Sequence, residues 1–169
     1  MVVAMKNRVR LVIIAGILLI VALALLPFWI RGRRMENRFR ANRELFQATA
    51  EAFCDKSIEI DWPVLVRSGD GREAVSKEYG FSESVINDID KILRTTNCCS
   101  IYADESCCKF KDGRINFKTG LIYISDAGQV AGRDAEDLVE SCTDLYVETA
   151  YFVDEQWIYF EGIPSYAMD

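Results

Sequence analysis

The longest apolar run in the chain covers residues 11–30, which are twenty consecutive residues without a charge. An α-helix of this length would extend roughly 30 Å, which matches the hydrocarbon core of a bilayer. Lys and Arg residues flank the run on both sides, as is typical of membrane-spanning helices. A cleaved signal peptide is the alternative, because Ala22-Leu23-Ala24 resembles a cleavage site, but six further apolar residues follow it. We therefore expect a transmembrane helix over residues 11–30 after a basic tail over residues 1–10.

Residues 31–55 show a second pattern, with apolar side chains at helical spacing and Arg, Asn and Glu on the remaining positions. The apolar positions are Met35, Phe39, Phe46, Ala50 and Phe53. This spacing predicts a basic juxtamembrane amphipathic helix. We expect its Phe stripe to pack against the following domain, with a membrane surface or a dimer contact as alternatives.

Residues 56–169 contain shorter patterns. Residues Ile58 to Val66 alternate apolar and polar positions, which predicts a half-buried strand. After Gly80, Ser82 is a candidate N-cap of a helix, and the apolar face of that helix comprises Val85, Ile86, Ile89, Ile92 and Leu93. We expect this segment to form the one further packed helix of the domain. Residues 134–141 are a candidate for another short helix.

From Cys98 onward, short β-rich runs alternate with turn signals. Asp112-Gly113 is the clearest hairpin signal, because a type I′ turn needs positive φ angles that Gly adopts freely. The run Trp157 to Phe160 is expected to fold back on Leu145 to Val153. The predicted fold class is therefore α+β: an N-terminal transmembrane helix, an amphipathic helix, and a compact domain with a mainly antiparallel sheet and one packed helix.

Charge divides the chain. Residues 1–43 carry nine Lys or Arg and one Glu, whereas residues 44–169 carry eleven Lys or Arg and twenty-five Asp or Glu. The basic segment can attract anionic lipid headgroups at about 1 kcal/mol per residue, in addition to acting as a topogenic signal. The acidic domain over residues 56–169 is a poor partner for phosphate backbones, so we expect no nucleic acid partner.

Two signals in the sequence disagree on which side of the membrane carries the acidic domain. A plain count of Lys and Arg around residues 11–30 favours the cytoplasm, whereas a basic tail followed by an apolar run resembles an uncleaved export signal. Six cysteines in the part that follows fit an oxidising compartment better than a reducing one. We therefore expect a single-pass protein of the cell membrane with its large domain outside the cytoplasm.

The six cysteines are disulfide candidates, and fifteen pairings are possible among six thiols. If residues 99 to 107 span a hairpin loop, Cys98 faces Cys108 and Cys99 faces Cys107, and a bridge between Cys54 and Cys142 would close a long loop. Free buried thiols are the second reading, and a metal or redox site is the third, because neither a zinc pattern nor a C-x-x-C pair occurs. The candidates are Cys54, Cys98, Cys99, Cys107, Cys108 and Cys142.

Other candidate sites favour structural explanations. The acidic cluster of Asp134, Glu136, Asp137 and Glu140 is typical of a solvated helix start. Residues 68–71 lack the ligands of a calcium loop or a phosphate loop and predict a turn. A ligand groove could involve a group of aromatic side chains, but a core role is the default. That group is Tyr123, Tyr151, Trp157 and Tyr159.

The chain contains no His, which excludes Ser/His/Asp and Cys/His catalysis and His-containing zinc sites. We find no catalytic, cofactor or metal residues, and we expect no cofactor. The sequence favours an anchored binding or accessory module whose protein or small-molecule partner is unknown. A membrane-anchored enzyme that uses carboxylates or thiols, and a scaffold that dimerises through the juxtamembrane helix, are the alternatives.

Overall fold

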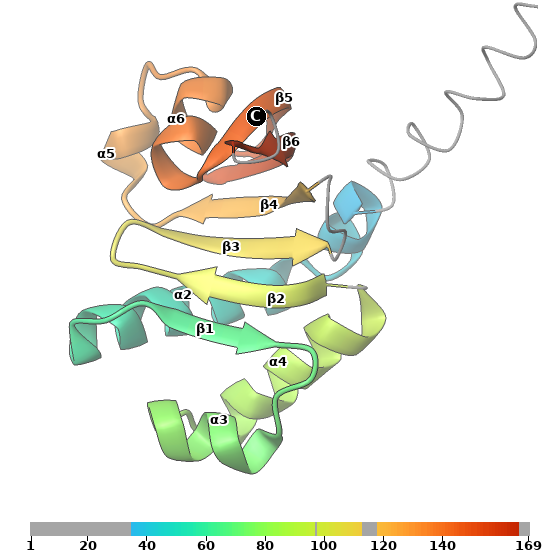
Figure 1. Cartoon of the computed structure of the whole chain (residues 1–169), viewed down its shortest axis with the longest axis vertical. Coiled ribbons are helices and arrows are strands. Elements are labelled where there is room, and N and C mark those ends of the chain that lie inside the picture. The colour runs from blue at the N-terminus through green and yellow to red at the C-terminus, as the bar shows by residue number, and fades with distance from the viewer. Residues whose placement is uncertain (1–34, 97, 113–117, 166–169) are drawn as a thin grey trace, which may run out of the picture. The chain divides into compact units, whose positions relative to one another are not determined.

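Six antiparallel strands in the order β1-β2-β3-β4-β6-β5 form one sheet (Figure 1). The computed structural model describes residues 35–96, 98–112 and 118–165, and the transmembrane helix expected over residues 11–30 lies outside them. The chain divides into two units, residues 1–34 and 35–169, and the sheet belongs to the second. None of the helices in the described residues combines the length and apolarity needed to cross a bilayer.

The helices and strands form an α+β arrangement with an antiparallel sheet, as expected. The strands are β1 (Val64–Arg67), β2 (Cys98–Ala103), β3 (Cys107–Asp112), β4 (Lys118–Ile124), β5 (Leu145–Asp154) and β6 (Trp157–Pro164). The helices are α2 (Arg43–Ile60), α3 (Arg72–Tyr79), α4 (Glu83–Thr95), α5 (Ala127–Val130) and α6 (Ala135–Cys142), and residues 35–41 are also helical. The fold therefore contains several helices after residue 60, rather than the single one that the sequence supported most clearly.

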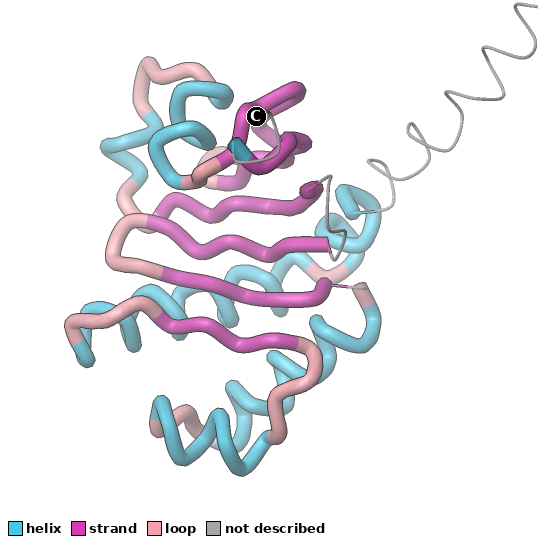
Figure 2. The backbone as a smooth tube through the Cα atoms, in the orientation of Figure 1, coloured by secondary structure: helices cyan, strands magenta, loops and turns pink. Residues whose placement is uncertain are grey.

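The sheet separates two apolar cores. Helices α2 and α4 cover one face, and the short helix α6 covers part of the other (Figure 2). Phe39 and Phe46 are buried in the larger core, where the Phe46 ring lies 5.0 Å from that of Phe110. The Phe stripe of residues 35–53 therefore packs on the sheet of its own domain, which confirms the expected core role.

Helix α2 ends later than the sequence pattern indicated, at Ile60 rather than at residue 55, and a turn at Asn42 separates it from the helical residues 35–41. The strand that follows is shorter than expected. Residues 58–60 are helical, and only Val64–Arg67 form β1. The strand predicted over residues 58–66 is therefore wrong for its first half, which belongs to the helix and the turn that follows it. Neither Gly nor Pro interrupts the helix before Pro63, and the steric effect of Pro63 on Trp62 disfavours further helix. Ile58 and Ile60 remain exposed at the helix end.

Helix α4 begins as predicted. The Ser82 hydroxyl accepts a 3.4 Å hydrogen bond from the backbone N–H of Val85, which satisfies one of the unpaired donors of the first turn. Phe81 before the cap and Ile86 after it are both buried, as in a hydrophobic staple. Ile89 and Ile92 complete the buried face, so capping and periodicity together explain the position of this helix.

The strands after residue 97 follow the predicted runs closely. β2 covers the run CCSIYA, and β6 pairs antiparallel with β5, so the final strand folds back as expected. β6 also pairs with β4, which places it inside the sheet and leaves β5 at the edge. The turn expected at Asp112-Gly113 reaches beyond the described residues, since Gly113 lies outside them.

The two edges of the sheet and one internal position show how closely the strands fit. β1 is an edge strand of four residues, and β5 is an edge strand with two register irregularities.

In the interior, a Cβ atom at Gly120 would lie 2.2 Å from the Phe110 carbonyl oxygen and 2.9 Å from the Phe160 ring. Glycine is therefore required at this position of β4 to allow the close approach.

Candidate functional site

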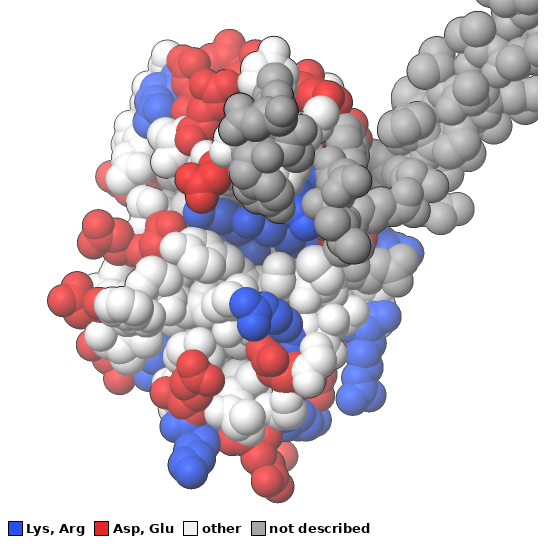
Figure 3. Space-filling model, viewed as in Figure 1, with Lys and Arg blue, Asp and Glu red and all other residues white. Residues whose placement is uncertain are grey.

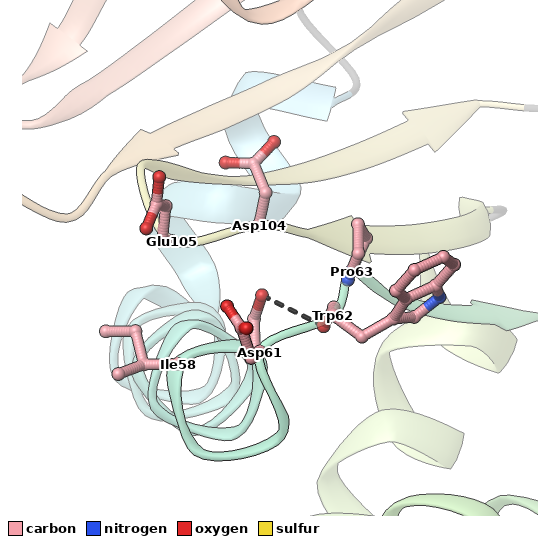
Figure 4. A pocket seen from close by; sticks show the side chains of 7 residues that line it. Ile58, Asp61, Trp62, Pro63, Asp104 and Glu105 are labelled. Atoms are coloured by element: carbon pink, nitrogen blue, oxygen red, sulfur yellow. Dashed lines mark hydrogen bonds between the residues drawn. The ribbon is translucent and has the colours of Figure 1, made fainter.

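A cavity of about 330 Å³ lies between the C-terminal end of α2 and the turn that joins β2 to β3 (Figure 4). Three of its lining residues are carboxylic acids, namely Asp61 from the end of α2 and Asp104 and Glu105 from the β2–β3 turn. None of the lining residues is basic, and the others are Ser57, Ile58, Trp62 and Pro63. We call this the acidic pocket.

The end of α2 is closed by a Schellman motif that fixes the wall of the acidic pocket. The backbone N–H of Trp62 donates to the Ser57 carbonyl at 3.3 Å, and that of Asp61 donates to the Ile58 carbonyl at 3.4 Å. The Ser57 hydroxyl donates back to the Trp62 carbonyl at 3.2 Å (Figure 4). Residues 57–62 are therefore tied together by three hydrogen bonds, which hold Asp61 and Trp62 in place.

Asp61 occupies the left-handed position of this motif, with φ 53° and ψ 38°. Within the described residues it is the one non-glycine residue with positive φ. Glycine is the usual residue at such a position, because an L side chain in this region is strained, although Asp tolerates it better than most residues. The chain thus carries a carboxylate at a position where glycine would be more stable.

Asp104 is held rigidly by the turn. Its Oδ1 accepts hydrogen bonds from the N–H of Ser106 at 3.0 Å, the hydroxyl of Ser106 at 2.7 Å and the N–H of Cys107 at 3.0 Å. Its Oδ2 lies 3.5 Å from Nζ of Lys109. Partial burial opposes ionisation, but these hydrogen bonds and the Lys109 charge outweigh it and lower the pKa of Asp104. Asp104 is therefore a carboxylate at neutral pH.

Apolar side chains rim the acidic pocket. Trp62 is 72% exposed and Ile58 is 61% exposed, and both rank among the most exposed large apolar residues of the described chain. The indole of Trp62 extends past Pro63, on the side away from Asp61, Asp104 and Glu105 (Figure 4). Carboxylates with exposed apolar side chains nearby suit a cationic group with an aliphatic stem, since apolar surface can cover the stem while the charge meets the carboxylates.

All six cysteines are free, and five of them lie in two groups on opposite faces of the sheet. Cys54, Cys98 and Cys108 belong to the larger core, and burial raises the pKa of Cys54 and of Cys98 to about 12. Cys107 belongs to the smaller core, against which Cys142 packs. A bridge between Cys54 and Cys142 would have to cross the sheet and is excluded by this arrangement.

The hairpin of β2 and β3 also differs from the loop considered from the sequence. Cys98 is paired with Asp112, and Cys108 is paired with Ala103. The turn comprises residues 104–106 rather than 99–107, because β2 and β3 both extend further toward each other. Cys98 therefore does not face Cys108, and Cys99 does not face Cys107.

Cys107 and Cys142 instead lie together on the α6 face of the sheet. The two thiols share a hydrogen bond, which lowers the pKa of Cys142 to about 7 and raises that of Cys107. The Lys109 charge acts in the same direction on Cys142. Asp104 also contacts Cys107, with 3.8 Å between its Oδ2 and Sγ, so the β2–β3 turn links this thiol pair to the acidic pocket.

A basic strip crosses the open part of the α6 face. Figure 3 shows Lys and Arg side chains gathered across the middle of this face. Burial lowers the pKa of Lys111, and the nearby charges of Lys109 and Lys118 lower it further. Lys109 itself is buried, pairs with Asp104, and lies 4.4 Å from the ring centroid of Tyr102. The ion pair with Asp104 and the contact with the Tyr102 ring offset the cost of burying the charge of Lys109.

The other sites considered from the sequence are structural. Asp134 caps α6 by accepting from the N–H of Glu136 at 3.1 Å, and Asp70 accepts from the N–H of Arg67 at 2.7 Å within a turn. In the proposed aromatic groove, Tyr123, Trp157 and Tyr159 are core residues. No set of three or more potential metal-ligating His, Cys, Asp or Glu side chains converges within the described part of the chain.

Sequence reasoning missed the residues of the acidic pocket. Residues 58–66 were predicted to form a strand, so the end of a helix at Asp61 and Trp62 was not expected. Asp104 and Glu105 carried one available signal, because Asp followed by Ser two residues later is typical of a side-chain-stabilised turn. Their convergence with α2 depends on packing across the sheet edge, which no local pattern contains.

Comparisons of this chain with protein-family models, curated proteins and solved structures gave no match. The fold and the geometry of its sites therefore carry the functional argument.

Proposed function

We propose that this protein is a single-pass membrane-anchored binding module, held in the membrane by residues 11–30 and displayed at the cell surface. Its acidic pocket receives a basic side chain of a protein partner. The observation that supports this most directly is the lining of the cavity. Asp61, Asp104 and Glu105 line a space of about 330 Å³ whose lining contains no basic residue, although the carboxylate of Asp104 is directed to Ser106, Cys107 and Lys109.

Electrostatics favour a cation in this space. A cation that enters this space is attracted by the carboxylates that line it. Asp104 is already balanced in part by Lys109, which leaves Asp61 and Glu105 as the carboxylates that a ligand would approach. The exposed indole of Trp62 can cover the aliphatic stem or the flat guanidinium of a bound Arg.

The backbone of Asp61 adds an independent argument. A non-glycine residue in the left-handed region costs about 1 kcal/mol or more, and such strain tends to persist where a side chain is needed. In this chain the side chain supplies a carboxylate to the cavity. The strained position is thus explained if Asp61 binds a ligand.

The alternative roles are less well supported by the described residues. A scaffold that dimerises through the Phe stripe would need Phe39 and Phe46 on the surface, but both are buried in the domain. An enzyme would need a reactive group in an accessible site, and the thiol pair of Cys107 and Cys142 is the one arrangement that favours such chemistry. That pair lies on the other side of the turn from the acidic pocket.

Titration of the full-length protein in detergent with a triarginine peptide at low ionic strength tests the binding proposal. We expect a saturable change in tryptophan fluorescence that is absent in Trp62→Phe. Asp61→Asn and Glu105→Gln should each weaken binding about threefold or more, corresponding to about 0.7 kcal/mol.

The matched controls are Glu73→Gln and Glu148→Gln, which remove the same charge from exposed positions on α3 and β5. They should change the affinity by less than twofold or so, because screening weakens interactions with distant charges. Equal weakening by pocket and control variants would show general attraction to an acidic domain and would contradict a specific site.

A further inference from the structure

The pair formed by Cys107 and Cys142 stands apart from the other four thiols of the chain. Cys107 begins β3 and is fully buried against α6, whereas Cys142 ends α6 and is partly exposed. One thiol is therefore partly open to solvent, and the second belongs to the core against which the first packs. Neither residue belongs to the lining of the acidic pocket.

We propose that Cys107 and Cys142 form a dithiol site that reacts with disulfides, with Cys142 as the attacking thiol and Cys107 as the resolving thiol. The disulfide is either a small molecule or an exposed bridge on a partner protein, since both offer the same sulfur–sulfur bond. This proposal is independent of the acidic pocket and of the ligand assigned to it.

The end of α6 holds Cys142 in position. The Ser141 hydroxyl donates to the Leu138 carbonyl at 2.8 Å, and the Thr143 hydroxyl donates to the Val139 carbonyl at 2.8 Å. Leu138 and Val139 are themselves buried against the sheet. The last turn of α6 is therefore fastened on both sides, so that Cys142 stays next to Cys107.

The surroundings distinguish the roles of the two thiols. Cys107 donates toward Cys142 and lies 3.8 Å from the Asp104 carboxylate, so it retains its proton. Cys142 accepts that hydrogen bond and lies within the field of the Lys109 ammonium group, which stabilises its thiolate. A thiolate is the nucleophile in disulfide exchange, so the exposed residue of the pair is the one prepared to attack.

The reaction balances without a further reagent. The Cys142 thiolate attacks a disulfide RS–SR′, forms the mixed disulfide Cys142–S–SR and releases R′S⁻, which takes a proton from water. Cys107 then attacks Sγ of Cys142, which forms the Cys107–Cys142 disulfide, and its proton goes to the departing RS⁻. The two thiols are oxidised by two electrons, and RS–SR′ is reduced to two thiols.

The other thiols lack this combination. Burial raises the pKa of Cys54 and Cys98 to about 12, and burial with the charges of those two residues raises the pKa of Cys108. Cys99 is partly exposed on β2 but contacts the Ser100 hydroxyl at 3.8 Å. It serves as a matched control for solvent access.

The test uses full-length protein in detergent, treated with glutathione disulfide at neutral pH and analysed by peptide mass spectrometry after alkylation. In the wild-type protein we expect a crosslink between the peptides of Cys107 and Cys142 and two released glutathione molecules per protein. Cys107→Ser should instead accumulate a mixed disulfide with glutathione on Cys142, because the resolving thiol is missing. Cys142→Ser should lose glutathione-dependent oxidation by at least about tenfold, whereas Cys99→Ser should react like the wild type.

Each contrary result identifies a specific failure. A stable glutathione adduct on Cys142 of the wild-type protein would show that Cys107 does not resolve it. Preferential modification of Cys99, or equal oxidation of Cys142→Ser, would show that exposure alone governs reactivity. Because the wild-type crosslink is itself a positive or negative result, the proposal stays testable even if a Cys107 variant folds poorly.

The two sources of the disulfide can be separated with the same variant. Cys107→Ser should trap small-molecule adducts when incubated with glutathione disulfide. It should trap protein adducts when incubated with a disulfide-containing protein such as native ribonuclease A with its disulfides intact. Trapping of glutathione alone would assign the site to small molecules. Failure of this chemistry would leave triarginine binding unaffected, so the two proposals fail separately.

Discussion

Trp157 on β6 donates a 2.8 Å hydrogen bond from its indole Nε1 to Oε1 of Gln47 on α2. The indole is otherwise enclosed by aromatic rings, including Phe39 at 4.7 Å and Tyr123 at 5.1 Å between centroids. This contact joins the first long helix to the last strand, which are more than a hundred positions apart. It satisfies the one polar atom that the indole brings into the larger core.

Replacement of Gln47 should expose how much the larger core depends on that bond. Gln47→Leu leaves the indole N–H buried without an acceptor, which costs about 1–3 kcal/mol of unfolding free energy. Urea unfolding followed by tryptophan fluorescence measures the effect. Gln129→Leu, on exposed α5, should change stability by less than about 0.5 kcal/mol. An unchanged unfolding midpoint in Gln47→Leu would show that the indole finds another partner.

Gly120→Ala tests the close approach of three strands. The added Cβ would lie 2.2 Å from the Phe110 carbonyl oxygen, so β3 and β4 would have to separate. Overpacking of this kind typically costs about 1–3 kcal/mol. Gly69→Ala is the control, because nothing lies within 4 Å of its added Cβ. Comparable thermal unfolding of the two variants would contradict the tight packing.

Asp61→Gly should separate stability from binding. Glycine relieves the left-handed strain at φ 53°, so we expect a gain of about 0.5–1 kcal/mol in unfolding free energy. The same change removes one carboxylate from the acidic pocket and should weaken triarginine binding about threefold or more. Calorimetric unfolding and peptide titration measure the two effects on one sample. A variant that loses stability would contradict the strain, and one that keeps full affinity would contradict the role of Asp61 in the pocket.

The pH dependence of Cys142 follows from its thiol partner. The hydrogen bond from Cys107 lowers the pKa of Cys142 from 9.0 to about 7. Ser141 and Lys109 contribute in the same direction, and burial and the charge of Asp104 oppose the shift. The thiolate therefore forms as pH rises through about 7 and is lost below it. Iodoacetamide alkylation of Cys142, followed by peptide mass spectrometry, should be half-maximal near pH 7.

Cys107→Ala removes the hydrogen-bond donor, so the alkylation midpoint of Cys142 should move upward toward that of an ordinary thiol. Cys99→Ala leaves the pair intact and should leave the midpoint in place. If Cys107→Ala alkylates with the wild-type midpoint, the pair does not control the reactivity of Cys142.

Membrane attachment is a prediction from residues 11–30 alone. The full-length protein should sediment with membranes, resist extraction by high salt and alkaline carbonate, and dissolve in detergent. Leu19→Arg with Leu23→Arg adds about 2.5–3.5 kcal/mol per Arg at the centre of a spanning helix and should release the protein, whereas Leu19→Ile with Leu23→Ile should not. Recovery of the wild-type protein in a soluble fraction without detergent would refute the anchor.

Local rules predicted some of the fold because the relevant interactions are local. Ser82 caps α4 through a bond to a residue three positions away, and the apolar periodicity of that helix determines its buried face. The residues of β2 and β6 are mostly apolar, which is typical of strands that are covered on both faces. These elements are readable from a few neighbouring residues.

The remaining features depend on contacts between distant segments. The alternation at residues 58–60 fits a strand, but the continuing helix and its Schellman end prevail, and the strand pattern misleads there. The pairing of Cys107 with Cys142 depends on where α6 crosses the sheet, and the composition of the intervening residues contains no sign of it. The acidic pocket likewise forms only when the end of α2 meets the β2–β3 turn.

The two outermost strands protect the sheet from pairing with a second copy of the chain. β1 offers only four residues, and the ladder of β5 is interrupted twice by register irregularities. Short or bulged margins are poor templates for backbone pairing with a second polypeptide. Neighbouring copies at high concentration can therefore collide repeatedly without joining their sheets into a continuous β-structured aggregate.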